Sequence, residues 1–330
     1  MKVAIRGSGV AASAAARLLA RENIETVLLP APRAKTPVVM LSDPARALLC
    51  DVFADPALFA DRARIDRRIV AWGGGEPVTL PHGAVILAES DLDTLRPPSA
   101  TSDGADADII IHAAAPFPAS EVQRFAARHA EAVEVALRFR EDHSACWIEA
   151  VADGWLFLIP VDSERAWLLC VGGAAERLMD QSRHVTARVD PIGPASAQFD
   201  VSPRLLSSLQ GPGWLACGTA AIAFDPICGD GTAQALREAI LASAVIAAMA
   251  QGGDAQALRL HHESMLIAAM RRHLKLCADF YRSGGQGPWW QAQLAALAEG
   301  FDWCTSLLAT RPEPRYQLRD FHLIEREAAA

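Results

Sequence analysis

The first thirty residues alternate between apolar, glycine-rich and alanine-rich segments. Residues 1–6 (MKVAIR) are typical of a buried strand, and residues 7–12 (GSGVAA) of a tight turn. Alanine and leucine fill residues 11–21, which predicts a helix, and residues 26–29 predict a second strand. The order strand, turn, helix, strand is that of a βαβ unit, which opens a parallel sheet.

The turn carries the GxGxxA form of the dinucleotide-binding fingerprint. Gly7 permits the turn, Gly9 lets a pyrophosphate approach the backbone, and Ala12 keeps the helix close to the strand. Val10 and Ala11, where the turn passes into the helix, are further predicted contacts, because a helix N-terminus favours anions. We therefore predict a dinucleotide site at these residues, with a merely structural glycine turn as the alternative.

The end of the second strand lacks the acidic residue that usually binds the adenosine ribose. Residues 30–33 (PAPR) stand in its place. Arg33 either meets a phosphate or is a solvated loop cation. The N-terminus alone therefore does not identify the dinucleotide.

A second strand–turn–helix segment spans residues 214–243. A short apolar strand runs into a turn rich in Gly, Pro and Asp, and the turn opens directly into an apolar helix. This order aims backbone N–H groups, at the positive end of a helix dipole, at whatever lies beyond the strand. We expect an electron-rich group there.

An antiparallel meander is predicted in the middle of the chain, over residues 146–150, 153–160 and 165–169. We expect Trp155 and Phe157 to share one face of the central strand, with Ile159 excluded. The two aromatic residues form either a wall for a planar substrate or half of an ordinary core.

Taken together, these segments resemble the flavoprotein hydroxylase superfamily, which includes p-hydroxybenzoate hydroxylase-like monooxygenases and tryptophan halogenase-like enzymes. The resemblance implies an FAD cofactor, with the helix N-terminus of the second segment facing the flavin pyrimidine. Thr219 stands where the family has Asp, and the 280–282 (FYR) and 288–290 (PWW) motifs resemble the closing helices of the halogenase-like branch. The FAD contacts implied in the second segment are Gly218, Thr219, Asp225, Pro226, Gly229, Asp230, Gly231 and Thr232.

The implied fold class is α/β, α+β overall. It comprises a Rossmann-like FAD-binding domain, an interleaved antiparallel β-meander substrate domain and C-terminal helices. The implied boundaries are 1–60, 106–140 and 212–250 for the FAD-binding domain, 61–105 and 141–211 for the substrate domain, and 251–330 for the helical segment.

Lysine usage separates the branches of the superfamily. The chain has lysine only at positions 2, 35 and 275, so the region expected to hold the halogenase relay lysine offers arginines such as Arg64, Arg67 and Arg68. A guanidinium keeps its charge and is a poor nucleophile, which disfavours halogenation. The predicted activity is FAD-dependent hydroxylation or oxidation of an aromatic or tryptophan-like group.

The predicted substrate is a small aromatic molecule or a tryptophan-containing protein or peptide, and NADH or NADPH is the candidate electron donor. Two alternatives stay open. One is an NAD(P)-dependent oxidoreductase without flavin. The other is a non-catalytic descendant of the fold that binds a ligand or a partner.

Two residues are candidates for catalysis. Cys228 precedes a helix N-terminus, which stabilises a thiolate, and is otherwise a small residue packed in a tight turn. His112, at the end of a strand over residues 108–112, either delivers a proton or is a hydrogen-bonded strand-end histidine. The histidines at 261, 262 and 273 share a helical stretch with two arginines, which predicts a solvated face.

Composition and charge narrow the expected location of the protein, its partners and its metal content. Among 330 residues, 51% are hydrophobic and 21% charged, and we expect a cytoplasmic protein without a signal peptide or an apolar run long enough to span a bilayer. The net charge of −8 argues against a nucleic-acid partner. The seven cysteines form no CxxC motif, and we find no His/Cys pair at ligand spacing. Both observations argue against zinc and against a disulfide framework. We therefore expect no metal.

Overall fold

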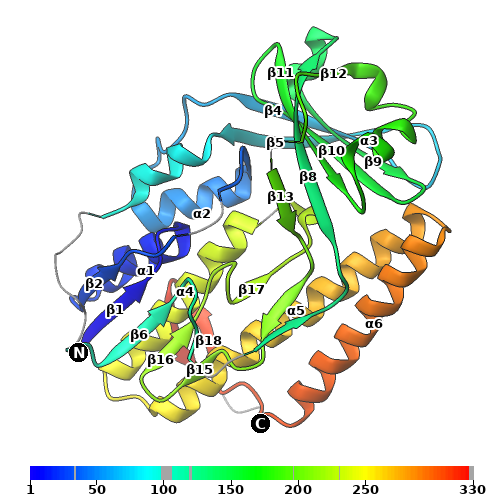
Figure 1. Ribbon diagram of the computed structural model, residues 1–330. Helices are drawn as coiled ribbons and strands as arrows, with labels where there is room; N and C mark the ends of the chain where they lie inside the picture. Colours follow the sequence, from blue (N-terminus) through cyan, green and yellow to red (C-terminus); the bar gives the residue numbers. More distant parts are fainter. Residues whose placement is uncertain (33–34, 98–105, 119–120, 196, 230, 327–330) are drawn as a thin grey trace.

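The computed structural model describes residues 1–330 except 33–34, 98–105, 119–120, 196, 230 and 327–330 (Figure 1). Its two main layers are a five-stranded and a nine-stranded sheet, and long helices follow toward the C-terminus. This mixed arrangement confirms the predicted fold class.

The five-stranded sheet has the order β15-β16-β6-β1-β2. Its strands are β1 (Lys2–Arg6), β2 (Glu25–Leu29), β6 (Ile109–His112), β15 (Gln210–Gly211) and β16 (Trp214–Ala216). All neighbours are parallel except β15 with β16. Helix α1 (Val10–Arg21) joins β1 to β2, which confirms the predicted βαβ unit. The carboxyl ends of β16, β6 and β1 therefore meet at one edge of the sheet, beside the N-terminus of α1.

The nine-stranded sheet contains the predicted meander. Its strands are β3 (Val39–Ser42), β4 (Arg64–Ala71), β5 (Val78–Leu87), β8 (His129–Leu137), β9 (Ala145–Val151), β10 (Gly154–Pro160), β11 (Arg165–Val171), β12 (Val189–Pro191) and β13 (Ala197–Asp200). Strands β9, β10 and β11 pair antiparallel, as predicted. Because β8 pairs with β11, segment 106–140 contributes to both sheets. The domain division otherwise stays a prediction.

The residues of β10 that share one face of the sheet differ from those expected. Trp155, Phe157 and Ile159 all belong to one hydrophobic cluster, whereas Leu156 and Leu158 belong to another. Alternate residues of a strand face the same side. The exclusion of Ile159 from the face of Trp155 and Phe157 was therefore wrong.

Smaller elements complete the fold. The short strands are β7 (Val122–Arg124), β14 (Arg204–Leu206) and β17 (Ile222–Ala223), which pair together, and the hairpin of β18 (Tyr316–Arg319) and β19 (His322–Glu325). The shorter helices are α2 (Asp43–Phe53) and α3 (Ala175–Asp180), with 3-10 turns at η1 (Glu89–Leu95), η2 (Arg140–Ser144), η3 (Thr186–Arg188) and η4 (Pro226–Cys228).

Helix α4 (Gly231–Ala250) is long and apolar enough to cross a membrane, by length and composition alone. The expectation that no segment meets this test was therefore wrong. Most of α4 is buried inside the protein, where it packs against α1 and α5. Its apolar composition is thus that of a core helix.

Helices α5 (Ala255–Gly284) and α6 (Pro288–Ala309) pack along one another (Figure 1). The histidines of α5 are buried: His261 is 6%, His262 0% and His273 4% exposed. The prediction of a solvated face was wrong for these residues. Because α5 lies between the sheets and α6, its inward positions are covered, while the neighbouring Arg272 faces solvent.

Candidate functional site

The turn after β1 has the geometry that a dinucleotide-binding turn needs. Gly7 has a φ of +145°, which favours glycine, and its N–H donates to the Leu29 carbonyl at 2.9 Å. A Cβ added to Gly7 would lie 3.1 Å from the Ala113 Cβ and 3.4 Å from that of Ala12. Ala12 thus packs closely against the turn, as the fingerprint requires.

The N-terminus of α1 favours an anion. Gly9 is its N-cap residue, in extended conformation, and no described side chain caps the helix there. The first turn carries no acidic residue. Its backbone N–H groups, at Val10 and Ala11, are therefore available to an anionic group such as a pyrophosphate.

The second predicted segment reaches the same place. Gly218 follows β16 with a φ of +79°, and a Cβ added to it would lie 3.1 Å from the Ala11 Cβ. The Gly218 N–H donates at 2.6 Å to the buried carboxylate of Glu238, on α4. Two motifs from opposite halves of the chain are thus brought together at the carboxyl edge of the parallel sheet.

The turn between β17 and α4 is fixed from within. The Asp225 carboxylate accepts from the Ile227 N–H at 2.9 Å and so caps η4, where Pro226 is the first residue. Gly229 follows in left-handed conformation with a φ of +61°. Helix α4 begins at Gly231, and a Cβ added there would meet no described atom within 4 Å. The residue next to it, Thr232, is half-buried in the first turn of the helix.

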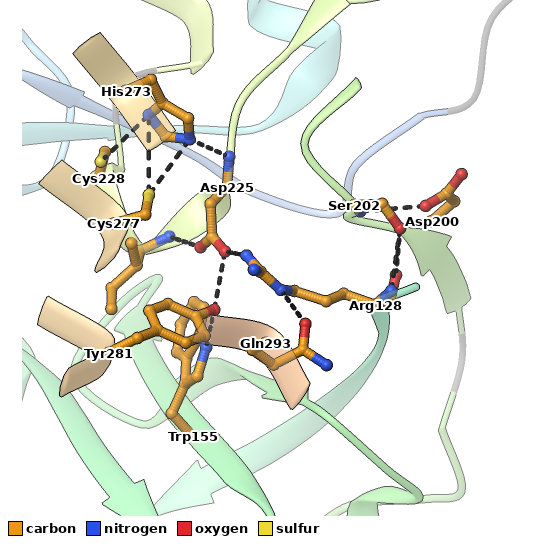
Figure 2. A network of polar contacts seen from close by, with 11 residues as sticks. Arg128, Trp155, Asp200, Ser202, Asp225, Cys228, His273, Cys277, Tyr281 and Gln293 are labelled. Carbon is orange, nitrogen blue, oxygen red and sulfur yellow. Dashed lines mark hydrogen bonds and ion pairs between the residues drawn. The ribbon is translucent and has the colours of Figure 1, made fainter. Parts of the chain in front are cut away.

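Asp225 also anchors a buried polar network (Figure 2). It forms an ion pair with Arg128, and both side chains are fully buried. The Tyr281 hydroxyl donates to Asp225 at 2.7 Å and accepts from Trp155 Nε1 at 3.0 Å, while Arg128 Nε donates to Gln293 at 2.5 Å. The network ties the turn to β10, α5 and α6.

Sequence reasoning did not find Arg128 as a buried residue. Its guanidinium lies over the Tyr281 ring, 4.5 Å from the centroid, and its Nη2 has no hydrogen-bond partner among the described residues. Burial and the Asp225 carboxylate raise the pKa of Tyr281 well above its usual value. Tyr281 therefore stays a hydroxyl that donates to Asp225.

The two candidate catalytic residues lie on different elements. His112 ends β6 between Phe117 and Trp214, and it is buried. Burial, and then the charge of Arg6, lower its pKa, so the neutral ring is favoured. His112 Nδ1 has no hydrogen-bond partner among the described residues, but a backbone hydrogen bond with Pro116 opposes the lowering of the pKa, as a hydrogen-bonded histidine would show.

Cys228 lies at the end of η4, where α5 contributes His273 and Cys277. His273 and Cys277 are four residues apart on one helix, which is a ligand spacing. The statement that the chain has no His/Cys pair at such spacing was therefore wrong. This spacing is the signal from which the cluster could have been found.

Some predicted cofactor contacts lie outside the described residues, and at other positions the carboxylate of the family is absent. Arg33 and Asp230 fall outside the described residues. Pro30 is exposed after β2, and Thr219 is exposed after Gly218. Neither side chain offers the carboxylate found in the family. Trp155 and Phe157 are buried, with Trp155 fully inaccessible, and their role as a substrate wall stays a prediction.

No family model matches the chain, and no curated protein matches it by sequence. Solved structures match nearly all of it. CmlS, a flavin-dependent halogenase, matches with a TM-score of 0.75 at 16% identity, over 97% of this chain and 74% of CmlS. The peptidyl tryptophan dihydroxylase QhpG, essential for tryptophylquinone cofactor biogenesis, has a TM-score of 0.72 at 22% identity, over 98% and 86% of the two chains.

A third match is the myxobacterial chondrochloren halogenase CndH, a variant of FAD-dependent halogenases. Its TM-score is 0.72 at 16% identity, over 94% of this chain and 90% of that one. At such identities the likeness is one of fold. It agrees with the resemblance found in the sequence motifs. The chain has the same fold as these two halogenases and the tryptophan dihydroxylase.

Proposed function

We propose that this protein is an FAD-dependent oxidoreductase of the monooxygenase kind. The observation that carries the proposal is the approach of Gly218 to Ala11, beside the Gly7 turn. A structural glycine turn alone would not explain why a second glycine motif is brought to the same helix N-terminus. This approach also argues against a nicotinamide enzyme without flavin, which has no use for the second segment.

The residues at this edge fit FAD. The α1 N-terminus offers N–H groups to the pyrophosphate, and Gly9 leaves the backbone open to it. Gly231, whose Cβ position is open, and the N-terminus of α4 would face the flavin pyrimidine. FAD, when bound, supplies electron transfer and the activation of dioxygen.

The chain's own residues bind the cofactor, orient the substrate and exclude water. The dipole of α4 favours the negative charge that a reduced flavin carries near its pyrimidine. The buried Arg128–Asp225 pair holds the preceding turn in place. No acid–base cluster is needed for this work, so Cys228 and His112 carry no assigned step.

Oxygen insertion is the proposed reaction in preference to halogenation. In β4, Arg68 lies close to the turn, with Nη2 3.4 Å from the Cβ position of Gly229. An arginine does not replace a relay lysine, and Lys275 is exposed on α5. The proposed substrate is an aromatic or tryptophan-like group, in keeping with the peptidyl tryptophan that QhpG modifies. NADH or NADPH is the proposed electron donor.

The exposed Pro30 and Thr219 favour a second candidate, a descendant that binds a ligand or partner without catalysis. Each replaces a carboxylate that in the family holds the cofactor. Loss of one such hydrogen bond costs about 1–3 kcal/mol, or roughly a tenfold to hundredfold loss of affinity. FAD binding is then weakened at two points.

Turnover distinguishes the two candidates. The protein loaded with FAD is incubated with NADH or NADPH and with either free tryptophan or a tryptophan-containing peptide, and products are analysed by mass spectrometry. Addition of oxygen to the indole, dependent on both FAD and protein, is the expected result. Retained FAD with neither cofactor reduction nor substrate oxidation would favour the non-catalytic descendant.

A further inference from the structure

Two thiols and an imidazole meet behind the turn that precedes α4. Cys228 lies at the end of η4, and His273 and Cys277 are one turn apart on α5 (Figure 2). Their sulfur and nitrogen atoms all lie within 4.8 Å of one another. Cys228 Sγ is 3.7 Å from His273 Nδ1, and Cys277 Sγ is 3.3 Å from His273 Nε2.

The backbone sets the tautomer of the imidazole. The Asp225 N–H donates to His273 Nε2 at 2.8 Å, so Nε2 must present its lone pair. In a neutral ring the proton then lies on Nδ1. Phe224 stacks on the ring, with centroids 4.1 Å apart and planes at 5°. The Nδ1–H is therefore held facing the sulfur of Cys228.

This tautomer disfavours a metal ion. A metal bound between the thiols and Nδ1 would need the lone pair of Nδ1, while Asp225 already occupies that of Nε2. Both lone pairs are free only in an imidazolate. The arrangement instead suits a thiolate that accepts a hydrogen bond from Nδ1–H.

The two cysteines are not equivalent. Cys228 is half-buried, and hydrogen bonds from Cys277 and then His273 outweigh burial, lowering its pKa to about 6. Cys277 is fully buried. The neighbouring Cys228 sulfur, burial and the Asp225 carboxylate raise the pKa of Cys277 well above its usual value, against the charge of Arg128. Cys228 is thus the thiolate and Cys277 the thiol that donates to it.

We propose that Cys228 and Cys277 form a redox-active pair that reacts with hydrogen peroxide. The Cys228 thiolate attacks one peroxide oxygen, the O–O bond breaks, and the second oxygen leaves as water after taking up a proton, so Cys228 becomes a sulfenic acid. The Cys277 sulfur then attacks the Cys228 sulfur and displaces its oxygen as a second water. Two thiols are oxidised to a disulfide, and one peroxide is reduced to two waters.

The disulfide would join η4 to α5, next to the turn that opens α4. Oxidation would thereby remove the Cys228 thiolate and tether the turn covalently to a long helix. The pair's chemistry rests on the contacts among Cys228, His273 and Cys277 and on the Asp225 N–H that sets the tautomer of His273. It does not depend on the proposed flavin activity.

The test uses the full chain, reduced and then treated with hydrogen peroxide, quenched with catalase, alkylated and digested. We expect a Cys228–Cys277 linked peptide that dithiothreitol releases, and a thiol count that falls by two from seven. Cys228→Ser should form no such link. Cys277→Ser should instead accumulate a sulfenic acid at Cys228, trapped by dimedone. Cys50→Ser, which removes a half-buried thiol on α2, is the matched control and should keep the linkage.

Two results would overturn the proposal. One is peroxide oxidation of other cysteines with no Cys228–Cys277 peptide, which the wild-type protein alone can reveal even if a variant fails to fold. The other is one equivalent of zinc in the purified protein, lost in Cys228→Ser, which would make the cluster a metal site.

Discussion

Gly218 lies so close to Ala11 that the two motifs of the candidate cofactor site leave no room for a side chain between them. Gly218 needs its left-handed φ of +79°, and a Cβ there would lie 3.1 Å from the Ala11 Cβ. Ala11 stands in the first turn of α1, whose N–H groups face the expected pyrophosphate. Any side chain at Gly218 therefore presses directly on that helix N-terminus.

Gly218→Ala should raise the dissociation constant for FAD by about tenfold or more. The methyl group pushes the β16 end and α1 apart, and it also adds left-handed strain of about 1–2 kcal/mol. Gly252→Ala is the control, because Gly252 shares the left-handed backbone (φ +90°) but has no described atom within 4 Å of its Cβ position. FAD titration should separate the variants, and equal affinities would contradict the placement.

Gly231→Val should displace the flavin pyrimidine without unfolding the protein. A Cβ at this position would meet no described atom within 4 Å, so the effect on the free energy of unfolding should be small. We expect an altered flavin absorbance spectrum and weaker retention. Gly193→Val, at a second position with open space, should change neither property. An unaltered spectrum of bound flavin in Gly231→Val would remove the pyrimidine from the α4 N-terminus.

Arg128→Met should lower the free energy of unfolding by about 3–5 kcal/mol, because it leaves the Asp225 carboxylate buried and unpaired. Urea denaturation measures the loss. Arg138→Met, which breaks an exposed ion pair with Asp190, should leave the midpoint nearly unchanged. Adding Asp225→Leu to Arg128→Met should restore part of the stability. Equal midpoints for the two arginine variants would refute the anchoring role.

Glu238→Gln should change how stability depends on pH. Burial raises the pKa of Glu238 to about 8, although Gln234 and the Gly218 N–H donate to its carboxylate. An unfolded glutamate has a pKa of about 4.3, so between these values the folded state holds a proton that the unfolded state releases. Stability from this group is present below about pH 4 and is lost as pH rises to about 8.

Glutamine does not titrate and still offers an oxygen to Gly218. As pH rises across this range, the free energy of unfolding of Glu238→Gln should therefore exceed that of the wild type by an increasing amount. The difference should level off above pH ~8. A difference independent of pH would show that Glu238 is already charged in the folded protein.

The βαβ unit was predictable because its signals are local. An apolar strand, Gly7 and Gly9 at the turn, and a run of alanines specify it within one short stretch of chain. The meander was predictable for the same reason. The face of Ile159 was also decided locally, by the two-residue period of a strand, and it was misassigned.

The buried network was not predictable in this way. Arg128, which directly precedes β8, pairs with Asp225 of the turn before α4, far away in the sequence, and charged residues are seldom fully buried unless paired. For the same reason, Arg271 and Arg272 suggested solvent for the whole stretch, while the turn before α4 covers His273 through Phe224 and Asp225. Long-range contacts decide these positions, and the sequence pattern alone does not contain them.

FAD retention tests whether the two glycine motifs form a cofactor site. The purified protein is mixed with excess FAD, separated from free flavin, and its visible absorbance is recorded beside that of Gly9→Val. We predict flavin bands that stay with the wild-type protein and are lost in the variant, since a branched side chain blocks the pyrophosphate's approach at the N-cap of α1. A wild-type protein that keeps no flavin, or a variant that keeps as much, would contradict the account.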